Sequence, residues 1–455
     1  MVGSISVVHE LASRISGVVL EPADPDFAAE VAGFNAAVRH APALVVGAAS
    51  PGDVAETVRY AAAHGLPVRV EATGHGAHTP VTDGILITTR RLDAVSIDPE
   101  ARVATVQAGA RWAAVIAAAA PHALAPITGS AGSVGVVGYL LGGGLGPLAR
   151  SHGFSSDRLL GATVVTGAGD VVDASPAGDA DLYWALRGGK GGLGVVTEVR
   201  IGLAEIPELY AGSLTFDGAH AETVLRGWID WTATAPDDVT TSLALMRFPD
   251  AEFLPPPIRG RFLAVLRVAA PRPADGGERV AAPLRALAPV ELDALDPLPL
   301  ADVARIHDDP EGPLPSWGWG ALLGPIDGEF AGTLASRFHA TAPVPFLGIE
   351  LRHLGGAAAV DVEGGSAVGG RGAAFAIHVL GVPDPSLFAD ALPRAAEGFA
   401  DAIRPWIAPA TNIHWISHVP DAAEFATAWP PATLARLAEV RRRVDPHGVF
   451  PYGPH

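Results

Sequence analysis

The spacing of apolar residues between 42 and 204 predicts short buried strands that alternate with helices. Apolar runs of about four residues, bounded by Gly, Pro or charged residues, are typical of such strands. Ser50 offers a helix N-cap, Pro51 suits the first helical position, and Gly65 ends the apolar repeat that follows. The pattern predicts strands at 43–47, 66–70, 85–88, 95–97, 103–106 and 195–201, a hairpin at 162–173, and helices at 51–65, near 111–120 and at 181–187.

The pattern changes after residue 204. Clusters of Pro separate amphipathic segments between 205 and 405, and the strands expected there would belong to another sheet. The further elements predicted are strands at 261–267, 345–354, 373–379 and 412–418 and a helix at 432–443. We therefore expect an α+β protein with an N-terminal domain at 1–204, a middle domain at 205–405 and a C-terminal segment at 406–455 that returns to the first domain.

Composition and charge disfavour several functions. The 455 residues are 49% hydrophobic, which allows a large core, and the formal net charge is −18. So acidic a chain is a poor general binder of nucleic acid or anionic membranes, because phosphate binding needs clustered Lys and Arg. No apolar run approaches the ~18 residues of a membrane span. No signal-peptide pattern opens the chain, so we expect a cytoplasmic protein.

Missing residue types narrow the chemistry. The chain has no Cys, which excludes disulfides, thiolate zinc sites, iron–sulfur clusters and Cys nucleophiles. Lys190 is the one lysine beside thirty arginines, so a pyridoxal phosphate Schiff base would have to use it. Because Lys190 sits among glycines, the sequence shows nothing that would shield or position it.

Two glycine-rich stretches and one histidine stand out. At the glycine density of 129–146, the backbone can approach a ligand closely and successive N–H groups can bind an anion. The stretch 188–194 contains G-x-G-x-x-G, but a strand follows where a Rossmann fold needs a helix. His75 lies between two glycines just after a predicted strand, which leaves its ring accessible to a ligand. A metal pair of His75 with His78 is disfavoured, because no carboxylate completes the ligand set.

Glycines of this kind can also serve tight turns alone, but three such loops within one region favour a long phosphate-bearing ligand. In their order along the chain, these residues resemble the FAD-linked oxidoreductases of the vanillyl-alcohol-oxidase/p-cresol-methylhydroxylase (PCMH) family, in the branch of the berberine-bridge enzyme (BBE). The stretches that carry the resemblance are Gly74-His75, Gly129–Gly146, Asp181–Thr197 and Val444–Phe450, with Glu350–Gly356 similar to the family's substrate domain.

The resemblance implies a fold for each part of the chain. Residues 1–204 would form a PCMH-type FAD-binding domain of two α/β subdomains, to which the BBE-like segment 406–455 returns. Residues 205–405 would form the substrate domain, an antiparallel sheet backed by helices.

The resemblance also implies which residues meet FAD. In the family, the His of the first loop often bonds covalently to the flavin 8α-methyl, and His75 matches it; a neutral imidazole nitrogen is a suitable nucleophile. Ala131 stands where some members have a second, Cys link, so one link is expected. Val134 matches a position described as gating oxygen, which fits an oxidase. The FAD contacts expected are Thr73, Gly74, His75, Gly76, Ala77, Gly129, Ser130, Ser133, Val134, Gly138, Tyr139, Gly142, Gly143, Gly194, Val195, Val196 and Asn412, with no metal.

The catalytic base cannot be carried over from the family. Many relatives have a Tyr just before an Asn-Phe pair near the C-terminus, and the stretch 409–415 has none. Tyr139 matches a site near the flavin and could serve as a phenol base; His353 and His414 are the other candidates. A structural role is the alternative for each of the three.

Strand alternation adds one expectation about the middle domain. On the strand 348–354, Glu350 and Arg352 share one face, while His353 lies on the other. Arg352 could therefore pair with Glu350.

Together these observations predict a cytoplasmic FAD-dependent oxidase. It would move a hydride from a C–H beside O or N of a small molecule, such as a secondary metabolite, to flavin N5 and then reduce O2. The alternatives are a dehydrogenase of the same fold with another acceptor, and a redox-neutral cyclisation or rearrangement that uses flavin as a scaffold. The protein would be a monomer or a homodimer, and the sequence does not identify the substrate.

Overall fold

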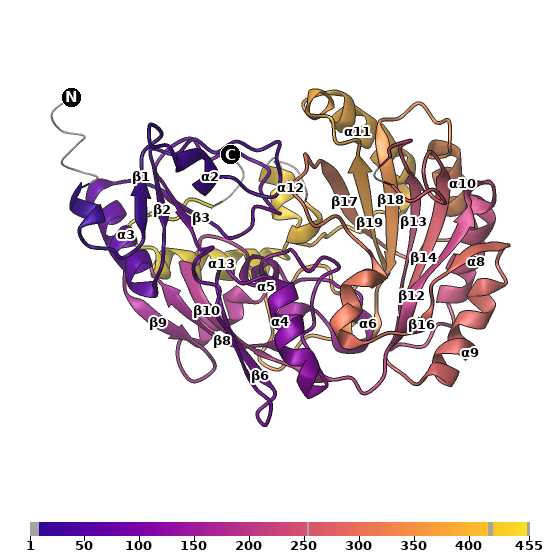
Figure 1. The fold of residues 1–455 in the computed structure, drawn as a ribbon, viewed down its shortest axis with the longest axis horizontal. Helices are drawn as coiled ribbons and strands as arrows, with labels where there is room; N and C mark the ends of the chain where they lie inside the picture. Colours follow the sequence, from indigo (N-terminus) through magenta and orange to yellow (C-terminus); the bar gives the residue numbers. More distant parts are fainter. Residues whose placement is uncertain (1–8, 253, 417–421, 453–455) are drawn as a thin grey trace.

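A computed structural model of the chain describes residues 9–252, 254–416 and 422–452. Figure 1 shows two halves that follow the chain, the first coloured indigo to magenta and the second magenta to orange. The last helix, α13 (Pro431–Val444, yellow), lies back among the elements of the first half. Its residues Leu437, Val440 and Val444 belong to the apolar core of that half.

The first half contains two larger sheets and one two-stranded antiparallel pair. The strands β2 (Leu44–Gly47), β4 (Ile85–Thr88) and β3 (Val68–Glu71) run parallel, with β1 (Val18–Leu20) antiparallel at one edge. The second sheet is antiparallel, in the order β5-β6-β10-β8-β9. Its strands are β5 (Val95–Asp98), β6 (Val103–Gln107), β8 (Leu159–Val165), β9 (Val171–Ala174) and β10 (Val195–Gly202). The predicted hairpin at 162–173 is confirmed as β8/β9, and the strands predicted at 95–97 and 103–106 pair with each other as β5/β6.

Local signals set the helices of this half. The predicted helix after β2 is α3 (Pro51–His64): the Ser50 side chain accepts a hydrogen bond from the Asp53 amide, and Gly65 closes the helix at φ 63°. The remaining helices and short strands are α2 (Phe27–Glu30), α4 (Trp112–Ala119), α5 (Val136–Leu141), α6 (Ala149–His152), α7 (Ala180–Leu186), β7 (Leu124–Ala125) and β11 (Ala204–Glu205). The helices predicted near 111–120 and at 181–187 are thus confirmed as α4 and α7.

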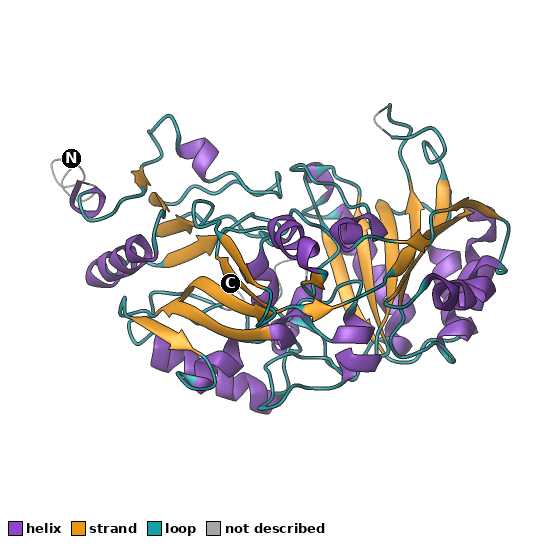
Figure 2. Ribbon diagram, turned by 60° about the horizontal axis from the view of Figure 1, so that its bottom comes forward, coloured by secondary structure: helices purple, strands orange, loops and turns teal. Residues whose placement is uncertain are grey.

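The second half is one antiparallel sheet with helices on its outer side (Figure 2). The strands run in the order β15-β12-β14-β13-β18-β19-β17, and β16 also pairs with β12. They are β12 (Tyr210–Asp217), β13 (Thr240–Arg247), β14 (Phe262–Ala270), β15 (Val290–Asp293), β16 (Asp296–Pro297), β17 (Gly318–Leu323), β18 (Phe346–His353) and β19 (Phe375–Gly381). The helices are α8 (Ala221–Thr232), α9 (Ala274–Arg285), α10 (Gly328–Arg337) and α11 (Ala391–Ile403), and α12 (Ala422–Ala426) follows near the C-terminus.

The two faces of this sheet differ in chemistry. Leu351 of β18 and Ile377 of β19 belong to the core that the helices cover, together with Trp228 of α8. Glu350 and Arg352 alternate with these residues and therefore lie on the face turned away from the helices. The sheet therefore presents charged side chains toward the first half of the molecule.

One predicted element is wrong. The strand expected at 412–418 is a single 3-10 turn at Ile413–Trp415, in which the Asn412 side chain accepts a hydrogen bond from the His414 amide. Asn readily forms such a turn, so the apolar alternation of this stretch does not produce a strand. Residues 417–421 lie outside the described residues.

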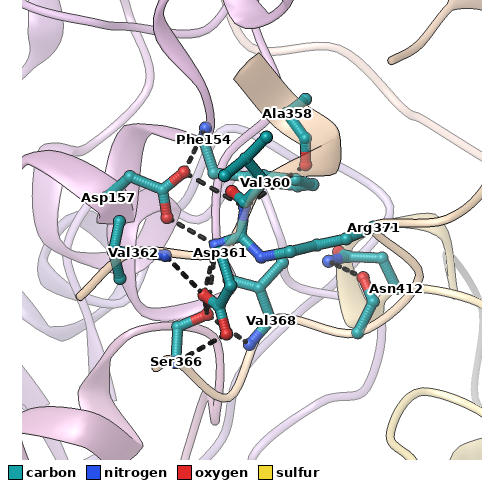
Figure 3. Close-up of polar contacts among 11 residues, drawn as sticks. Phe154, Asp157, Ala358, Val360, Asp361, Val362, Ser366, Val368, Arg371 and Asn412 are labelled. Atoms are coloured by element: carbon teal, nitrogen blue, oxygen red, sulfur yellow. Dashed lines mark hydrogen bonds and ion pairs between the residues drawn. The ribbon is translucent and has the colours of Figure 1, made fainter. Parts of the chain in front are cut away.

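A buried ion pair joins the two halves (Figure 3). Arg371, in the loop between β18 and β19, donates to Asp157 of the first half at 2.5 and 3.2 Å. The carbonyl groups of Ala358 and Val360 accept further bonds from the same guanidinium group. Both charged side chains are at most 10% exposed.

We expect Arg371→Met to lower the free energy of unfolding by about 2 kcal/mol, because the buried Asp157 carboxylate would keep only its bond from the Phe154 amide. Urea unfolding measures the change. Arg394→Met is the matched control, since its pair with Asp390 is exposed and should contribute less than about 1 kcal/mol. Equal effects of the two substitutions would contradict a stabilising role of the buried Arg371–Asp157 ion pair.

Candidate active site

His75 lies in the loop that follows β3, close to the glycine-rich stretch 129–146. Its Nε2 is 3.1 Å from the Ser133 hydroxyl oxygen, and its ring packs on Phe34 with 3.6 Å between centroids. Its Nδ1 is buried and has no hydrogen-bond partner among the described residues. Burial, assisted by the charge of Arg111, lowers the pKa of His75 to about 4. The imidazole is therefore neutral at pH 7.

The backbone around His75 needs its glycines. Gly74 has φ 72°, and a Cβ there would lie 2.6 Å from the Cα of Gly33. By contrast, a Cβ on Gly76 or Gly138 would meet nothing within 4 Å, so both face open space. The amide of Gly135 donates to the Thr73 hydroxyl at 3.3 Å and joins this loop to the start of α5. Such a surface suits a ligand that lies against backbone N–H groups.

The end of α5 carries a second group of side chains. His414 Nε2 lies 2.8 Å from the Tyr139 carbonyl oxygen and donates a hydrogen bond to it, because a carbonyl oxygen can only accept. A Cβ on Gly142 would lie 2.3 Å from the same nitrogen. Burial and then the charge of Lys190 lower the pKa of His414 to about 3. Burial raises the pKa of Tyr139, so its phenol keeps its proton.

A buried charge cluster closes the site from the sheet of the second half. Arg352 donates to Glu350 through Nε and Nη2 at 3.0 and 2.9 Å, which confirms the predicted pairing. Arg267 Nη1 and His307 Nε2 lie 3.4 and 3.3 Å from the other carboxylate oxygen. Burial alone would raise the pKa of Glu350, but these neighbours, Arg352 above all, hold it well below the usual value.

The charge cluster touches the first half directly. Arg352 Nη1 donates to the Leu145 carbonyl oxygen at 3.1 Å. A pocket lies between the loop 145–149 and the strands β13, β14 and β18. The two halves thus meet through a direct hydrogen bond beside this pocket.

Comparisons with known proteins identify the ligand class. Residues 42–175 match the FAD binding domain family. The (R)-6-hydroxynicotine oxidase of Paenarthrobacter nicotinovorans is 37% identical over 205 residues, which are 44% of this chain and 45% of that protein. The glucooligosaccharide oxidase of Sarocladium strictum is 31% identical over 47% of this chain and 44% of that protein. The chain thus aligns with about half the length of these relatives.

Solved structures show the same fold over nearly the whole chain. 6-Hydroxy-D-nicotine oxidase from Arthrobacter nicotinovorans superposes with a TM-score of 0.81 at 24% identity, over 97% of this chain and 98% of that one. The BBE-like protein 1 of Physcomitrella patens reaches a TM-score of 0.84 at 17% identity, over 98% of both chains. Residues 42–175 thus form an FAD binding domain, and the whole chain has the fold of these solved structures. The predicted resemblance and the α+β fold are confirmed, and relatives named oxidases or FAD-linked oxidoreductases agree with the predicted enzyme class.

The predicted FAD contacts fall into two groups. The first group includes α5 and its surroundings and consists of residues 73–77, residues 129–143 and Asn412. Asn412 is buried there beside Gly143. Gly194–Val196 open β10, against which α5 packs, and Val195 and Val196 are buried there. Whether each residue touches FAD stays a prediction. Among the described residues, no group of three potential metal ligands occurs, and no helix is long and apolar enough to cross a bilayer.

The three predicted bases are all held by neighbours. His353 Nε2 lies 3.2 Å from Arg150 Nη1, and its ring stacks on Phe375. His414 is tied to the Tyr139 carbonyl, and the Tyr139 ring is enclosed by Gly129 and Gly144. The strand 412–418, on which His414 was expected, is absent; His414 lies instead in the 3-10 turn that Asn412 caps.

Two polar residues near these groups were missed by the sequence analysis. His378 lies directly across from Glu350 in the β18/β19 pairing, and burial lowers its pKa to about 4. Its ring is partly exposed, 6.0 Å from that of Trp415. The carboxylate of Asp309 acts electrostatically on His75, Tyr139, Arg352 and His378. Alternation along 373–379 already places His378 on the polar face, whereas no local pattern indicates Asp309.

The buried histidines should make stability depend on pH. His75, His353, His378 and His414 have pKa values of about 3 to 4, below their usual 6.5. A depressed folded-state pKa contributes stability above pH 6.5, and that contribution is lost as the pH falls toward 4. We expect His353→Gln to reduce the slope of unfolding free energy against pH by about 1.4 kcal/mol per pH unit. Urea unfolding at pH 7, 6 and 5 measures it; an unchanged slope would show that His353 binds protons equally in the folded and unfolded states, which would contradict its lowered pKa.

Proposed function

We propose that the protein is an FAD-dependent oxidase that carries its FAD on His75 and oxidises a small molecule at a C–H beside O or N, with O2 as electron acceptor. The main support is the state of His75, a neutral ring whose buried Nδ1 has no hydrogen-bond partner in the described part of the chain. One solved relative, the glucooligosaccharide oxidase of Acremonium strictum, is named for an 8α-N1-histidyl, 6-S-cysteinyl FAD. Without Cys, only the histidyl link is available to this chain.

The residues present fit FAD. Gly76 and Gly138 leave room where a side chain would stand, and the loops 73–77 and 129–138 would hold the cofactor by their backbone. The Ser133 hydroxyl can accept a hydrogen bond from a protonated Nε2, and in that tautomer the lone pair is on Nδ1. When bound, FAD would supply the acceptor for the hydride of the substrate, which carries both electrons of the oxidation.

The proton of the substrate needs a base on the other side of the site. We place His378 first, because its ring is neutral and partly exposed, and no described hydrogen bond occupies its nitrogens. Arg352 would stabilise a developing negative oxygen nearby. Tyr139, His353 and His414 follow, since their groups are enclosed or engaged. A secondary-metabolite substrate, a cytoplasmic location and a monomeric or dimeric state belong to the same proposal.

The visible spectrum of the purified protein tests the cofactor. A flavin spectrum, as isolated or after incubation with FAD, is the expected result. A colourless protein after that incubation would overturn the proposal.

Reoxidation tests the acceptor without knowledge of the substrate. After anaerobic photoreduction, admission of air should restore the flavin colour within seconds. Slow recolouring in air combined with rapid recolouring by a quinone or dye would favour the dehydrogenase alternative.

A further inference from the structure

Lys190 is placed by the fold, contrary to the expectation that nothing positions it. Its backbone N–H donates to the Leu141 carbonyl oxygen at 2.8 Å, and its Nζ donates to the Gly138 carbonyl oxygen at 2.9 Å. Both acceptors lie on α5, the helix beside the proposed FAD site. The single lysine of the chain is therefore fixed at this helix.

The backbone conformation at Lys190 is one that glycine adopts more easily. Its φ is 65°, in the left-handed region that other residues rarely enter, and glycines stand on both sides of it. A glycine at 190 would avoid that strain. The backbone conformation therefore does not explain why a lysine occupies this position.

The surroundings of the Lys190 ammonium resemble the wall of a ligand cavity. Gly138, its acceptor, faces open space, and Lys190 itself keeps partial exposure. Burial lowers the pKa of Lys190 to about 8, and its positive charge helps to lower the pKa of His414. Surrounding atoms therefore desolvate a group that still has accessible surface, as expected in the wall of a ligand cavity. Within the described chain, Nζ donates one hydrogen bond, although an ammonium can donate three.

We propose that Lys190 sets a fixed positive charge against bound FAD and favours the states in which the flavin ring carries negative charge. The inference rests on the proposed function. His75 is tied to Ser133, ahead of α5, whereas Lys190 is tied to Gly138 within that helix. If His75 is bonded to the methyl edge of the flavin ring, the charge of Lys190 beside α5 can act on the remainder of the cofactor. A nearby positive charge raises the reduction potential of a flavin.

Sulfite titration of the holoenzyme measures this charge directly. The sulfur of sulfite bonds to N5 of oxidised flavin, its electron pair becomes negative charge in the ring, and the flavin colour bleaches. Lys190→Met removes the charge and should raise the dissociation constant for sulfite at least about tenfold. Lys190→Arg should stay within about threefold of the wild type. The same tenfold change corresponds to a fall of ~30 mV in the two-electron reduction potential.

Two further variants separate charge from backbone. Lys190→Gly relieves the positive-φ strain but also removes the charge, so it should match Lys190→Met. Arg441→Met is the control, because Arg441 donates to the carbonyls of Gly189 and Gly191 and supports the same loop without contacting Lys190. Its sulfite affinity should remain within about threefold. Unchanged sulfite affinity in Lys190→Met and Lys190→Gly would reduce Lys190 to a helix contact and overturn the proposal.

A measurement on the wild-type protein covers variants that fail to fold. Reductive methylation with ¹³C-formaldehyde keeps the positive charge and labels only Lys190 and the N-terminal amine. The NMR signal that Lys190→Arg lacks should shift when the flavin is reduced by dithionite. A signal that does not move, or variants that lose FAD while keeping normal sulfite affinity in the loaded fraction, would contradict a charge at the ring and favour a phosphate contact. Absence of flavin altogether would instead contradict the proposed function.

Discussion

Replacing His75 with alanine is expected to abolish acid-stable flavin. The wild-type protein, precipitated in acid, should keep its yellow colour in the pellet, because a covalent bond survives unfolding. In His75→Ala, the colour should pass entirely into the supernatant, since the chain has no Cys for a second link. Absorbance of the two fractions, with the mass of the intact protein, measures the outcome. An acid-stable flavin in His75→Ala would show that another residue forms the bond.

Ser133→Ala is the matched control for the nucleophile. This substitution leaves the His75 ring in place but removes the hydroxyl beside its Nε2. We expect covalent attachment to be slowed rather than abolished, because the tautomer that leaves Nδ1 free is no longer favoured. The time course of attachment after FAD is added to flavin-free protein measures the difference. A wild-type rate in Ser133→Ala would show that the hydroxyl does not select the tautomer.

Glu350→Gln is expected to lower the free energy of unfolding by about 3 to 5 kcal/mol at pH 7. Glu350 is 7% exposed and offsets the charges of Arg267 and Arg352. The glutamine has almost the same shape, so the loss would come from two half-buried guanidinium groups without a countercharge. Urea unfolding of both proteins measures the change.

A surface pair supplies the control for this substitution. Glu222→Gln removes a carboxylate from an exposed pair with Arg226 and should cost less than about 1 kcal/mol. The Glu350 effect should also shrink in acid. Its folded-state pKa is depressed, so its contribution is present above pH 4.5 and is lost as the pH falls below that value. Equal costs for both substitutions would contradict a buried, electrostatically coupled Glu350.

Elements with local signals were predicted well. The Ser50 cap, the Gly65 stop and the short turns of the two hairpins act within a few residues, so a single stretch of sequence contains the whole signal. The prediction of a strand at 412–418 is wrong because another local signal, a side-chain hydrogen bond, overrides the apolar alternation. Ile413 and Trp415 alternate as in a strand, but the Asn412 side chain bonds the His414 amide and turns the chain.

The candidate site divides in a similar way. His75 stands between glycines after a strand, and that local pattern identified it. Glu350 and Arg352 were correctly paired, because residues two apart on a strand share a face. His378 was missed because its position opposite Glu350 depends on how β18 and β19 pair. Lys190 was misjudged because its partner, Gly138, is 52 residues away in the sequence.

By itself, the sequence determined the resemblance to FAD-linked oxidoreductases, the order of most strands and helices, the glycine-rich loops and the candidate His75. Each of these depends on residues close together in the chain or on motifs in a fixed order. Only the tertiary structure decided which side chains meet: the halves joined by Arg371 and Asp157, the charge cluster around Glu350 and the place of Lys190 on α5. The physical reason is that burial, pKa shifts and ion pairs arise from distances between remote residues, which strand pairing and domain packing set.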